Sequence, residues 1–166
     1  MKHYYDTFST PVGDFSVAVD ADGRVVATAF GGLTKLRERF DAGEIARDTA
    51  RLVAVGREVA DYFTGKRELF TFKLAPSGTL FQQAVWAALQ RIPFGETRSY
   101  GQLAVELGKA GAARAVGRAN ATNPIALFIP CHRVIGRDGA LTGFAFGEDI
   151  KRQLLALERV SSAALV

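Results

Sequence analysis

The residues of this chain with the clearest capacity for chemistry are a cysteine and a histidine that stand side by side. Cys131 is the one cysteine among 166 residues, and His132 follows it directly. A cysteine thiolate is a strong nucleophile, and an imidazole can accept the thiol proton. An unassisted thiol with a pKa near 8.5 is only about 3% ionised at neutral pH, so a base is needed. The pair predicts nucleophilic chemistry at Cys131, although a lone cysteine is more often a small core residue.

The neighbours of Cys131 favour the reactive interpretation. The apolar run 125–129 predicts a buried strand, and Pro130 ends its pairing, so Cys131 is expected where a loop begins. His132 and Arg133 make the surroundings electropositive, which favours the thiolate. Adjacency alone does not establish that His132 contacts the thiol, and a carboxylate that orients the imidazole must come from elsewhere in the chain.

The residue counts exclude several other chemistries. One cysteine forms neither an internal disulfide nor a dithiol redox pair. With only His3 and His132 beside it, a closed zinc site of cysteine and histidine ligands lacks its fourth ligand. We therefore expect no metal and no cofactor. The apolar runs are too short to span a bilayer and the start of the chain has no apolar signal segment, which predicts a cytoplasmic protein with no membrane partner.

The positive charge of the chain is concentrated in its second half. Residues 1–80 hold equal numbers of basic and acidic side chains, so the whole net charge of +4 lies in residues 81–166. No acidic residue occurs between Leu107 and Arg137, whereas five basic residues do. A segment of one sign favours phosphate contacts and a polyanionic partner. The alternative interpretation is a solvated basic surface.

The first third of the chain predicts an antiparallel sheet with one helix. Residues 10–13 and 20–23 have turn composition, and the apolar residues after each turn predict strands over 15–19 and 25–30. Apolar residues at helical spacing predict a helix from about Thr49 to Phe63. No catalytic cluster stands out in this region, which we interpret as a scaffold.

After a linker-like stretch at 75–78 the pattern becomes helical. A hydroxyl residue followed three positions later by glutamine, at 79–82 and again at 99–102, is a capping box that predicts a helix start. We expect helices over about 80–92, 100–107 and 112–119. The last two, joined by a turn containing glycine, have helix-turn-helix spacing.

The third of these helices is composed almost entirely of small residues. Arg114 and Arg118 are exceptions, and because they are four positions apart they share one face. Small neighbours would allow the helix backbone to approach a nucleic-acid groove closely. The alternative is a helix packed within its own domain that carries two surface arginines. The acid-free flanks favour DNA.

A series of motifs around Cys131 resembles one known family. Residues 130–134, Pro-Cys-His-Arg-Val, are similar to the active-site motif of the O6-alkylguanine-DNA alkyltransferases, also called methylated-DNA–protein-cysteine methyltransferases. Further motifs stand in the family order at 92–97, 99–100, 113–117, 123–124 and 154–158. The resemblance is strong from about Phe81 to Glu158 and weaker at 10–13.

The resemblance implies an α/β fold in two parts. Residues 1–75 would form a scaffold domain, an antiparallel sheet with a helix of ribonuclease H-like type. Residues 76–166 would form a mostly helical domain that contains the helix-turn-helix, binds DNA and accepts the alkyl group. The implied partner is double-stranded DNA bearing alkylated guanine, bound by a monomer.

The resemblance also implies roles for four catalytic residues. Cys131 would attack the alkyl carbon on guanine O6 and keep the group as a thioether. His132 would take the thiol proton through a bridging water, and Glu158 would orient the imidazole. Tyr100 resembles the residue that gives a proton to the leaving guanine. Because the thioether is stable and no second thiol can accept the group, each molecule would act once on O6-methylguanine or O4-methylthymine.

Other positions match family residues that contact DNA or the flipped base. Arg114 resembles the arginine that fills the space left by the nucleotide, which must leave the duplex to be reached. Asn123 resembles a hinge between the recognition helix and the cysteine loop, and the Val134 carbonyl would face the guanine edge. The helix residues expected against the minor groove also include Ala113, Gly117 and Arg118.

The sequence departs from the family pattern after the cysteine. Phe144 and Phe146 replace a tyrosine and a small residue, which leaves the shape of the alkyl pocket open, and 149–150 also differs. The additional cysteines and histidines of zinc-binding members are lacking. Two other interpretations remain, a lesion-binding relative that does not react, which Cys131 argues against, and a cysteine hydrolase that turns over.

Overall fold

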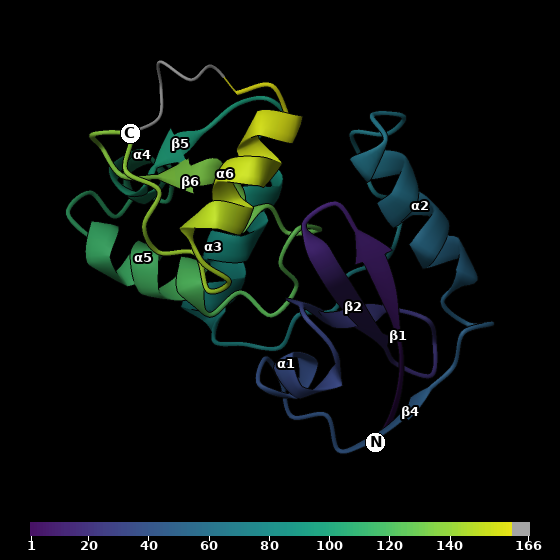
Figure 1. Cartoon of the computed structure of the whole chain (residues 1–166). Coiled ribbons are helices and arrows are strands. Elements are labelled where there is room, and N and C mark those ends of the chain that lie inside the picture. The colour runs from purple at the N-terminus through teal and green to yellow at the C-terminus, as the bar shows by residue number, and fades with distance from the viewer. Residues whose placement is uncertain (161–166) are drawn as a thin grey trace. The chain divides into compact units, whose positions relative to one another are not determined.

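The computed structural model describes residues 1–160, which form two compact units. The first unit comprises Met1–Ser77, and the second begins at Gly78. Each unit is a mixture of helices and strands (Figure 1). No helix within residues 1–160 is long and apolar enough to cross a membrane.

The first unit is built on a four-stranded sheet. Its strands pair in the order β3-β2-β1-β4 (Figure 1), with bounds Lys2–Thr10 for β1, Gly13–Val19 for β2, Val25–Phe30 for β3 and Glu44–Arg47 for β4. The two predicted turns and the strands that follow them are confirmed. The expectation of a purely antiparallel sheet is wrong, because β4 pairs with β1 in parallel. This pairing joins residues about forty positions apart, which a local pattern does not reveal.

The hairpin turn between β2 and β3 illustrates how local chemistry sets this sheet. Gly23 has a φ of +81°, a conformation that glycine adopts without strain. The Asp20 carboxylate accepts the backbone N–H groups of Asp22 and Arg24, both at 3.0 Å. The turn is therefore closed by its own residues. Strand β2 lies between β1 and β3 and is buried on both faces from Phe15 to Val19.

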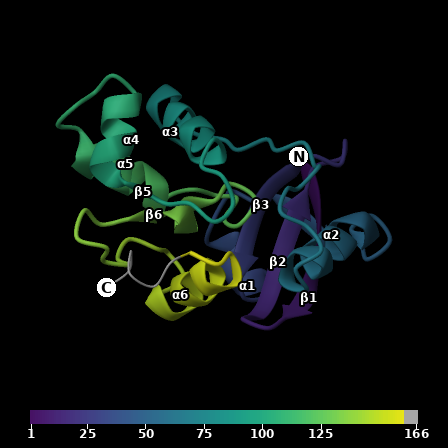
Figure 2. The same cartoon turned by 90° about the horizontal axis from the view of Figure 1, so that it is seen from above.

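Two helices complete the first unit. Helix α1 spans Leu33–Arg37 and α2 spans Val53–Phe63, with Val55, Val59 and Tyr62 buried. The predicted start of α2 at Thr49 is too early, because the Leu52 N–H bonds the Thr49 carbonyl in a separate turn. In Figure 2, α2 lies alongside β1 and β2.

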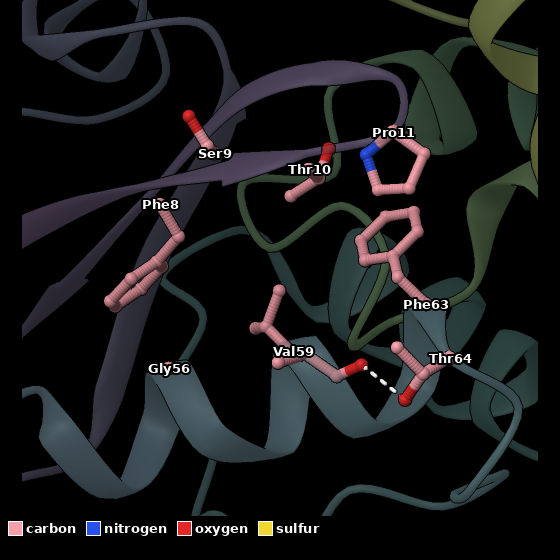
Figure 3. Close-up of a pocket in the computed structure, with 9 residues that line it drawn as sticks. Phe8, Ser9, Thr10, Pro11, Gly56, Val59, Phe63 and Thr64 are labelled. Carbon is pink, nitrogen blue, oxygen red and sulfur yellow. Dashed lines mark hydrogen bonds between the residues drawn. The ribbon is translucent and has the colours of Figure 1, made fainter.

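A pocket of about 170 Å³ lies between α2 and the end of β1 (Figure 3). Gly56 in its wall makes room for the Phe8 ring, because a Cβ at this position would lie 2.7 Å from that ring. The Thr64 hydroxyl on its rim donates to the Ala60 carbonyl at 2.9 Å. Its lining is mainly apolar, and no cluster of chemically reactive side chains is found there.

The second unit is mostly helical, as expected. Its helices are α3 (Leu80–Gln90), α4 (Tyr100–Glu106), α5 (Ala113–Ala121) and α6 (Glu148–Leu157), and two short strands, β5 (Arg98–Ser99) and β6 (Val134–Ile135), pair in parallel. Both predicted capping boxes are present, at the starts of α3 and α4. The Trp86 indole N–H donates to the Ala119 carbonyl at 2.8 Å, which ties α3 to α5.

The predicted strand over 125–129 is wrong. Leu127 has a φ of +76°, which no extended strand contains, and the Ile129 N–H returns to the Ile125 carbonyl at 2.9 Å. The Asn123 side chain closes this loop by accepting the Ile125 N–H and donating to the Ile129 carbonyl, both at 2.9 Å. The apolar run is therefore a compact buried turn that delivers the chain to Pro130.

Candidate active site

Cys131 occupies the first position of a single 3₁₀ turn, η1, which spans Cys131–Arg133 and leads into β6. The Cys131 N–H donates to the Ile129 carbonyl at 2.7 Å, so the closed loop before Pro130 sets the entry into this turn. Cys131 is 4% exposed. The thiol therefore lies in a largely desolvated site in which neighbouring charges act strongly.

Glu158 binds the two residues that follow the cysteine. Its Oε2 lies 2.7 Å from His132 Nε2, and its Oε1 lies 2.7 Å from Arg133 Nε. Arg133 adds a second bond from Nη2 to Oε2 at 3.1 Å and a third from Nη1 to the Ile92 carbonyl at 2.8 Å. The sequence analysis required a carboxylate from elsewhere in the chain to orient the imidazole. Glu158, at the end of α6, makes the hydrogen bond that this role requires.

The protonation states of this buried cluster follow from its contacts. Burial raises the pKa of Glu158, but the attraction of His132 and Arg133, together with their hydrogen bonds, outweighs it and lowers this pKa to about 2. Complete burial lowers the pKa of His132, even against the opposing attraction of Glu158. Near neutral pH the pair therefore consists of a carboxylate and a neutral imidazole.

The hydrogen bond to Glu158 also selects the tautomer of His132. Because an ionised carboxylate only accepts, Nε2 carries the hydrogen and Nδ1 carries the lone pair. Nδ1 is buried and has no hydrogen-bond partner among residues 1–160. A neutral imidazole with this tautomer can accept a proton at Nδ1.

Tyr100, at the first position of α4, is bonded to the segment between β6 and α6. Its hydroxyl donates to the Thr142 carbonyl at 2.9 Å. Burial and the negative charge of Cys131 both raise the pKa of Tyr100, which keeps its hydroxyl protonated. Gly143 makes this contact possible, since its φ is +84° and a Cβ there would overlap the Tyr100 hydroxyl.

Lys151 is a site residue that the sequence analysis missed. Its side chain is 0% exposed, and Nζ donates to the Val134 carbonyl at 2.5 Å and to the Thr142 carbonyl at 3.1 Å. The signal was its spacing, because Lys151 lies three and four positions before Leu154 and Leu155, on the buried face of α6. The carbonyl of Val134, which we expected to face the guanine edge, thus bonds an ammonium group.

The residues expected to contact DNA lie along α5 (green in Figure 1), with different exposures. Arg114 and Arg118 are exposed, and Ala113 is half-buried at the first helical position. Gly117 faces Tyr100, because a Cβ there would lie 3.8 Å from the tyrosine ring. The helix therefore packs near Tyr100 on one side and presents both arginines to solvent.

Two buried asparagines join α5 and the segment after it to the cysteine turn. Asn123 bonds the backbone at both ends of the 125–129 loop, as described above. Asn120, which the sequence analysis did not single out, donates from Nδ2 to the Cys131 carbonyl at 3.4 Å and is 2% exposed. The cysteine backbone is thus tied to α5 by a side chain of that helix.

The aromatic departures lie together in the loop that precedes α6. Phe144 is buried, Phe146 is half-buried, and their rings meet edge to face with centroids 5.7 Å apart. Residues 149–150 fall in the first turn of α6. Within the described residues, no group of three or more histidine, cysteine, aspartate or glutamate side chains could hold a metal ion.

Comparison with known proteins identifies the family. Residues 80–160 match the family model described as 6-O-methylguanine DNA methyltransferase, DNA binding domain. A methylated-DNA–protein-cysteine methyltransferase of Methanosarcina barkeri is 46% identical over 158 residues, 93% of this chain and 96% of the relative. The constitutive enzyme of that name from Bacillus subtilis is 41% identical, covering 96% and 97%.

Solved structures agree with this assignment over nearly the whole chain. The O6-methylguanine methyltransferase of Mycobacterium tuberculosis superposes with a TM-score of 0.85 at 41% identity, covering 95% of this chain and 93% of the other. The structure of the same organism's OGT in complex with DNA gives 0.84 at 39% identity, covering 98% and 94%. The chain belongs to the methylated-DNA–protein-cysteine methyltransferase family, which confirms the resemblance and the mixed α/β fold.

Proposed function

We propose that this protein repairs O6-methylguanine in double-stranded DNA by transferring the methyl group to its own Cys131. The observation that carries the proposal is the buried hydrogen bond between Glu158 and His132, because His132 directly follows the only cysteine of the chain. Relatives similar over nearly the whole length of the chain are named for this activity, and one similar structure holds DNA. Neither a metal nor a cofactor is needed for a direct displacement by a thiolate.

The proposed reaction assigns one task to each buried group. His132, held in its neutral tautomer by Glu158, takes the Cys131 proton at Nδ1 through a bridging water. The sulfur forms a bond to the methyl carbon as the bond from that carbon to guanine O6 breaks. The electron pair goes to guanine, and Tyr100, which stays protonated at neutral pH, donates to the leaving base. The thioether product is stable, so each molecule acts once.

We further propose that α4 and α5 act as a helix-turn-helix in the minor groove. Two exposed arginines on α5 and an acid-free stretch from 107 to 137 favour phosphate contacts. The small residues of α5, including Ala113 and Gly117, permit close approach of its backbone to the groove. Arg114 would enter the base stack as the damaged nucleotide leaves it, and Asn123 would keep the cysteine turn in register with α5.

Several finer expectations belong to the same proposal. O4-methylthymine is a second substrate, and the protein acts as a monomer in the cytosol. The Val134 carbonyl, which accepts a hydrogen bond from Lys151 Nζ with one lone pair, offers the other to the guanine edge. Phe144 and Phe146, whose rings meet edge to face in the loop before α6, would line the alkyl pocket. In the same proposal, residues 1–75 form a ribonuclease H-like scaffold, and residues 76–166 form the domain that binds DNA and accepts the alkyl group.

The proposal is tested by incubating the protein with a duplex that contains one O6-methylguanine and analysing its peptides by mass spectrometry. We expect the mass of one methyl group on the peptide that contains Cys131, and restored guanine in the DNA. The control is Cys131→Ala, which should leave both unchanged. Equal repair by Cys131→Ala, or a methyl group on another residue, contradicts the proposal.

The role of Arg114 is tested by comparing two substrates. Arg114→Ala should slow repair in duplex DNA far more than transfer from free O6-benzylguanine, because only the duplex requires the nucleotide to be displaced. Arg118→Ala on the same face of α5 is the matched control, and it should weaken DNA binding and reduce its salt dependence. Equal losses on both substrates for Arg114→Ala contradict a role in base flipping.

A further inference from the structure

Asn120 is a polar side chain on the buried face of α5. It is 2% exposed, and the other residues that this helix buries are Val116 and Ala119. A carboxamide has two donor hydrogens and an oxygen with two lone pairs, so it is costly to bury unless these groups are bonded. Its Nδ2 donates to the Cys131 carbonyl at 3.4 Å. The amide therefore lies against the peptide bond that joins Cys131 to His132.

This contact decides which end of the amide is the oxygen. Because a carbonyl only accepts, the amide nitrogen of Asn120 is the atom that faces the Cys131 carbonyl. The other end is Oδ1, which is buried and has no hydrogen-bond partner among residues 1–160. Buried polar atoms of native proteins are almost always bonded, either to the protein or to ordered water. The oxygen of Asn120 therefore requires a donor.

His132 Nδ1 has the same requirement on the other side of that peptide bond. It is also buried without a hydrogen-bond partner among the described residues, and it carries a lone pair because Glu158 holds the hydrogen on Nε2. Two acceptors cannot bond one another. A water molecule can donate one hydrogen to each, and its oxygen can accept the S–H of Cys131. A buried water makes about three hydrogen bonds to groups that otherwise lack partners, so these three atoms would complete its shell.

We propose that Asn120 is a positioning residue whose Oδ1 holds a buried water, the relay water, between Cys131 and His132. None of the family motifs in the sequence includes Asn120, which is a different residue from the hinge Asn123. The inference rests on the proposed function in taking Cys131 as the nucleophile and His132 as the base. It adds the group that fixes the water through which their proton passes.

The relay conserves every proton. At the start the Cys131 thiol donates to the water oxygen, and the water donates one hydrogen to His132 Nδ1 and the other to Asn120 Oδ1. The thiol proton moves to the water as the hydrogen facing Nδ1 moves to the imidazole. The products are a thiolate, a protonated imidazole and a water that accepts from Nδ1 and donates to the sulfur. The bond to Asn120 is the same before and after, so the water does not have to turn.

A crystal structure of the unreacted protein, at a resolution that shows ordered water, tests the site directly. We expect a water within hydrogen-bond distance of Asn120 Oδ1, His132 Nδ1 and Cys131 Sγ. Asn120→Leu keeps a similar side-chain size but removes the acceptor, and it should lack this water. A protein group bonded to Asn120 Oδ1, or the same water in Asn120→Leu, overturns the proposal.

The rate of transfer from free O6-benzylguanine, measured against pH, tests the role. Near neutral pH the transfer by Asn120→Leu should be about tenfold slower than that of the wild type, which is the size of one hydrogen bond. Well above the pKa of the thiol, Cys131 ionises without a base, and the ratio of the two rates should fall toward one. The matched control is Thr122→Val, at an exposed residue that ends the same helix, and its pH profile should be that of the wild type.

Other ionisable groups around the cysteine turn do not affect this ratio. Arg133 and Glu158 are bonded to each other. Burial lowers the pKa of Lys151 to about 8 and raises the pKa of Tyr100. Both proteins contain all four groups, so their titration changes the two rates together and cancels when one rate is divided by the other.

A purely structural role for Asn120 gives a different profile. If its amide only anchored the Cys131 carbonyl, Asn120→Leu would misplace the sulfur and slow transfer by the same factor at every pH, which overturns the proposal. Should Asn120→Leu fail to fold, Asn120→Met removes the same oxygen with a side chain that fills irregular space, and the same convergence at high pH is expected.

Failure of this inference and failure of the proposed function give different results. A wild type that transfers the alkyl group to Cys131 at the same rate as Asn120→Leu throughout the pH range contradicts the inference and leaves the proposed function standing. A wild type that holds water on all three atoms but transfers no alkyl group contradicts the proposed function and leaves the water site standing.

Discussion

The buried polar side chains of the two units serve different purposes. In the first unit such groups are dispersed, and each bonds its own partner. Asp20 closes a hairpin turn, and Asp6 pairs with Arg47 of the neighbouring strand. His3 Nδ1 lies 2.6 Å from the Ala42 carbonyl. These contacts stabilise individual turns and strand pairs of the sheet.

In the second unit the buried polar side chains converge on one short segment. Among the described residues there are six: His132 and Arg133 belong to the segment 129–134, and four others bond its backbone or side chains, namely Asn120, Asn123, Lys151 and Glu158. Buried polar groups are costly unless they are paired, so a concentration of them around six residues requires a reason. The reason we infer is the placement of Cys131, whereas the first unit needs only a stable sheet.

The largest effect is expected for replacing Glu158, the carboxylate that bonds both His132 and Arg133. Glu158→Gln removes the negative partner of a buried arginine and should cost about 3–5 kcal/mol of the free energy of unfolding. It should also slow alkyl transfer about a hundredfold, because His132 loses the negative charge that orients its ring and stabilises its protonated form. In the first unit Asp6→Asn breaks an ion pair whose arginine is 60% exposed, and it should cost about 1 kcal/mol or less without changing transfer.

Urea denaturation and transfer from free O6-benzylguanine measure the two quantities for both variants. Equal losses of stability, or an unchanged transfer rate in Glu158→Gln, would remove the distinction between the dispersed and convergent arrangements.

The second prediction concerns the stability of the fold at acidic pH. The pKa of folded His132 lies below its ordinary value of 6.5, so below that pH the unfolded chain binds more protons and stability falls as the pH falls. Glu158 adds a loss below its ordinary pKa of 4.5, which continues toward its folded value of about 2. Each group contributes at most about 1.4 kcal/mol per pH unit.

Denaturation midpoints measured from neutral pH to about pH 5 isolate the histidine. Over this range the wild type should lose more stability than His132→Gln, which has no group to protonate at this position. Parallel curves would show that the imidazole is not held neutral by burial.

The smallest expected effect distinguishes two glycines that have similar φ angles. Gly23 and Gly143 have φ values of +81° and +84°, so alanine at either position should cost about 1 kcal/mol in backbone strain. A Cβ at Gly23 meets nothing within 4 Å, whereas at Gly143 it overlaps the Tyr100 hydroxyl. Gly143→Ala should therefore also slow transfer several-fold, and Gly23→Ala should not. Thermal unfolding and transfer assays on both variants check this, and identical transfer rates would contradict the placement of Tyr100.

The parts of this molecule that the sequence predicted correctly depend on short-range chemistry. The capping boxes at Thr79 and Ser99 and the turn at Gly23 each involve residues a few positions apart. Cys131 and His132 stand out because they are adjacent and because the surrounding motifs resemble a known family.

The parts that were missed depend on contacts between distant residues. The run 125–129 has the composition of a strand, but the bonds made by Asn123, with the backbone bond from Ile129 to Ile125, make it a closed loop. Lys151 has the composition of a surface residue on an amphipathic helix, and only the packing of α6 reveals that it is buried against the Val134 carbonyl. The parallel pairing of β4 with β1 is likewise non-local.

We infer that the second unit places Cys131 to be consumed in a single reaction. The most direct measurement is the number of methyl groups transferred per protein chain in the presence of excess duplex bearing labelled O6-methylguanine. We expect a rapid rise that stops at one methyl group per chain, with all label bound to the protein. Continued release of methyl groups beyond one per chain, as a cysteine hydrolase would give, contradicts it.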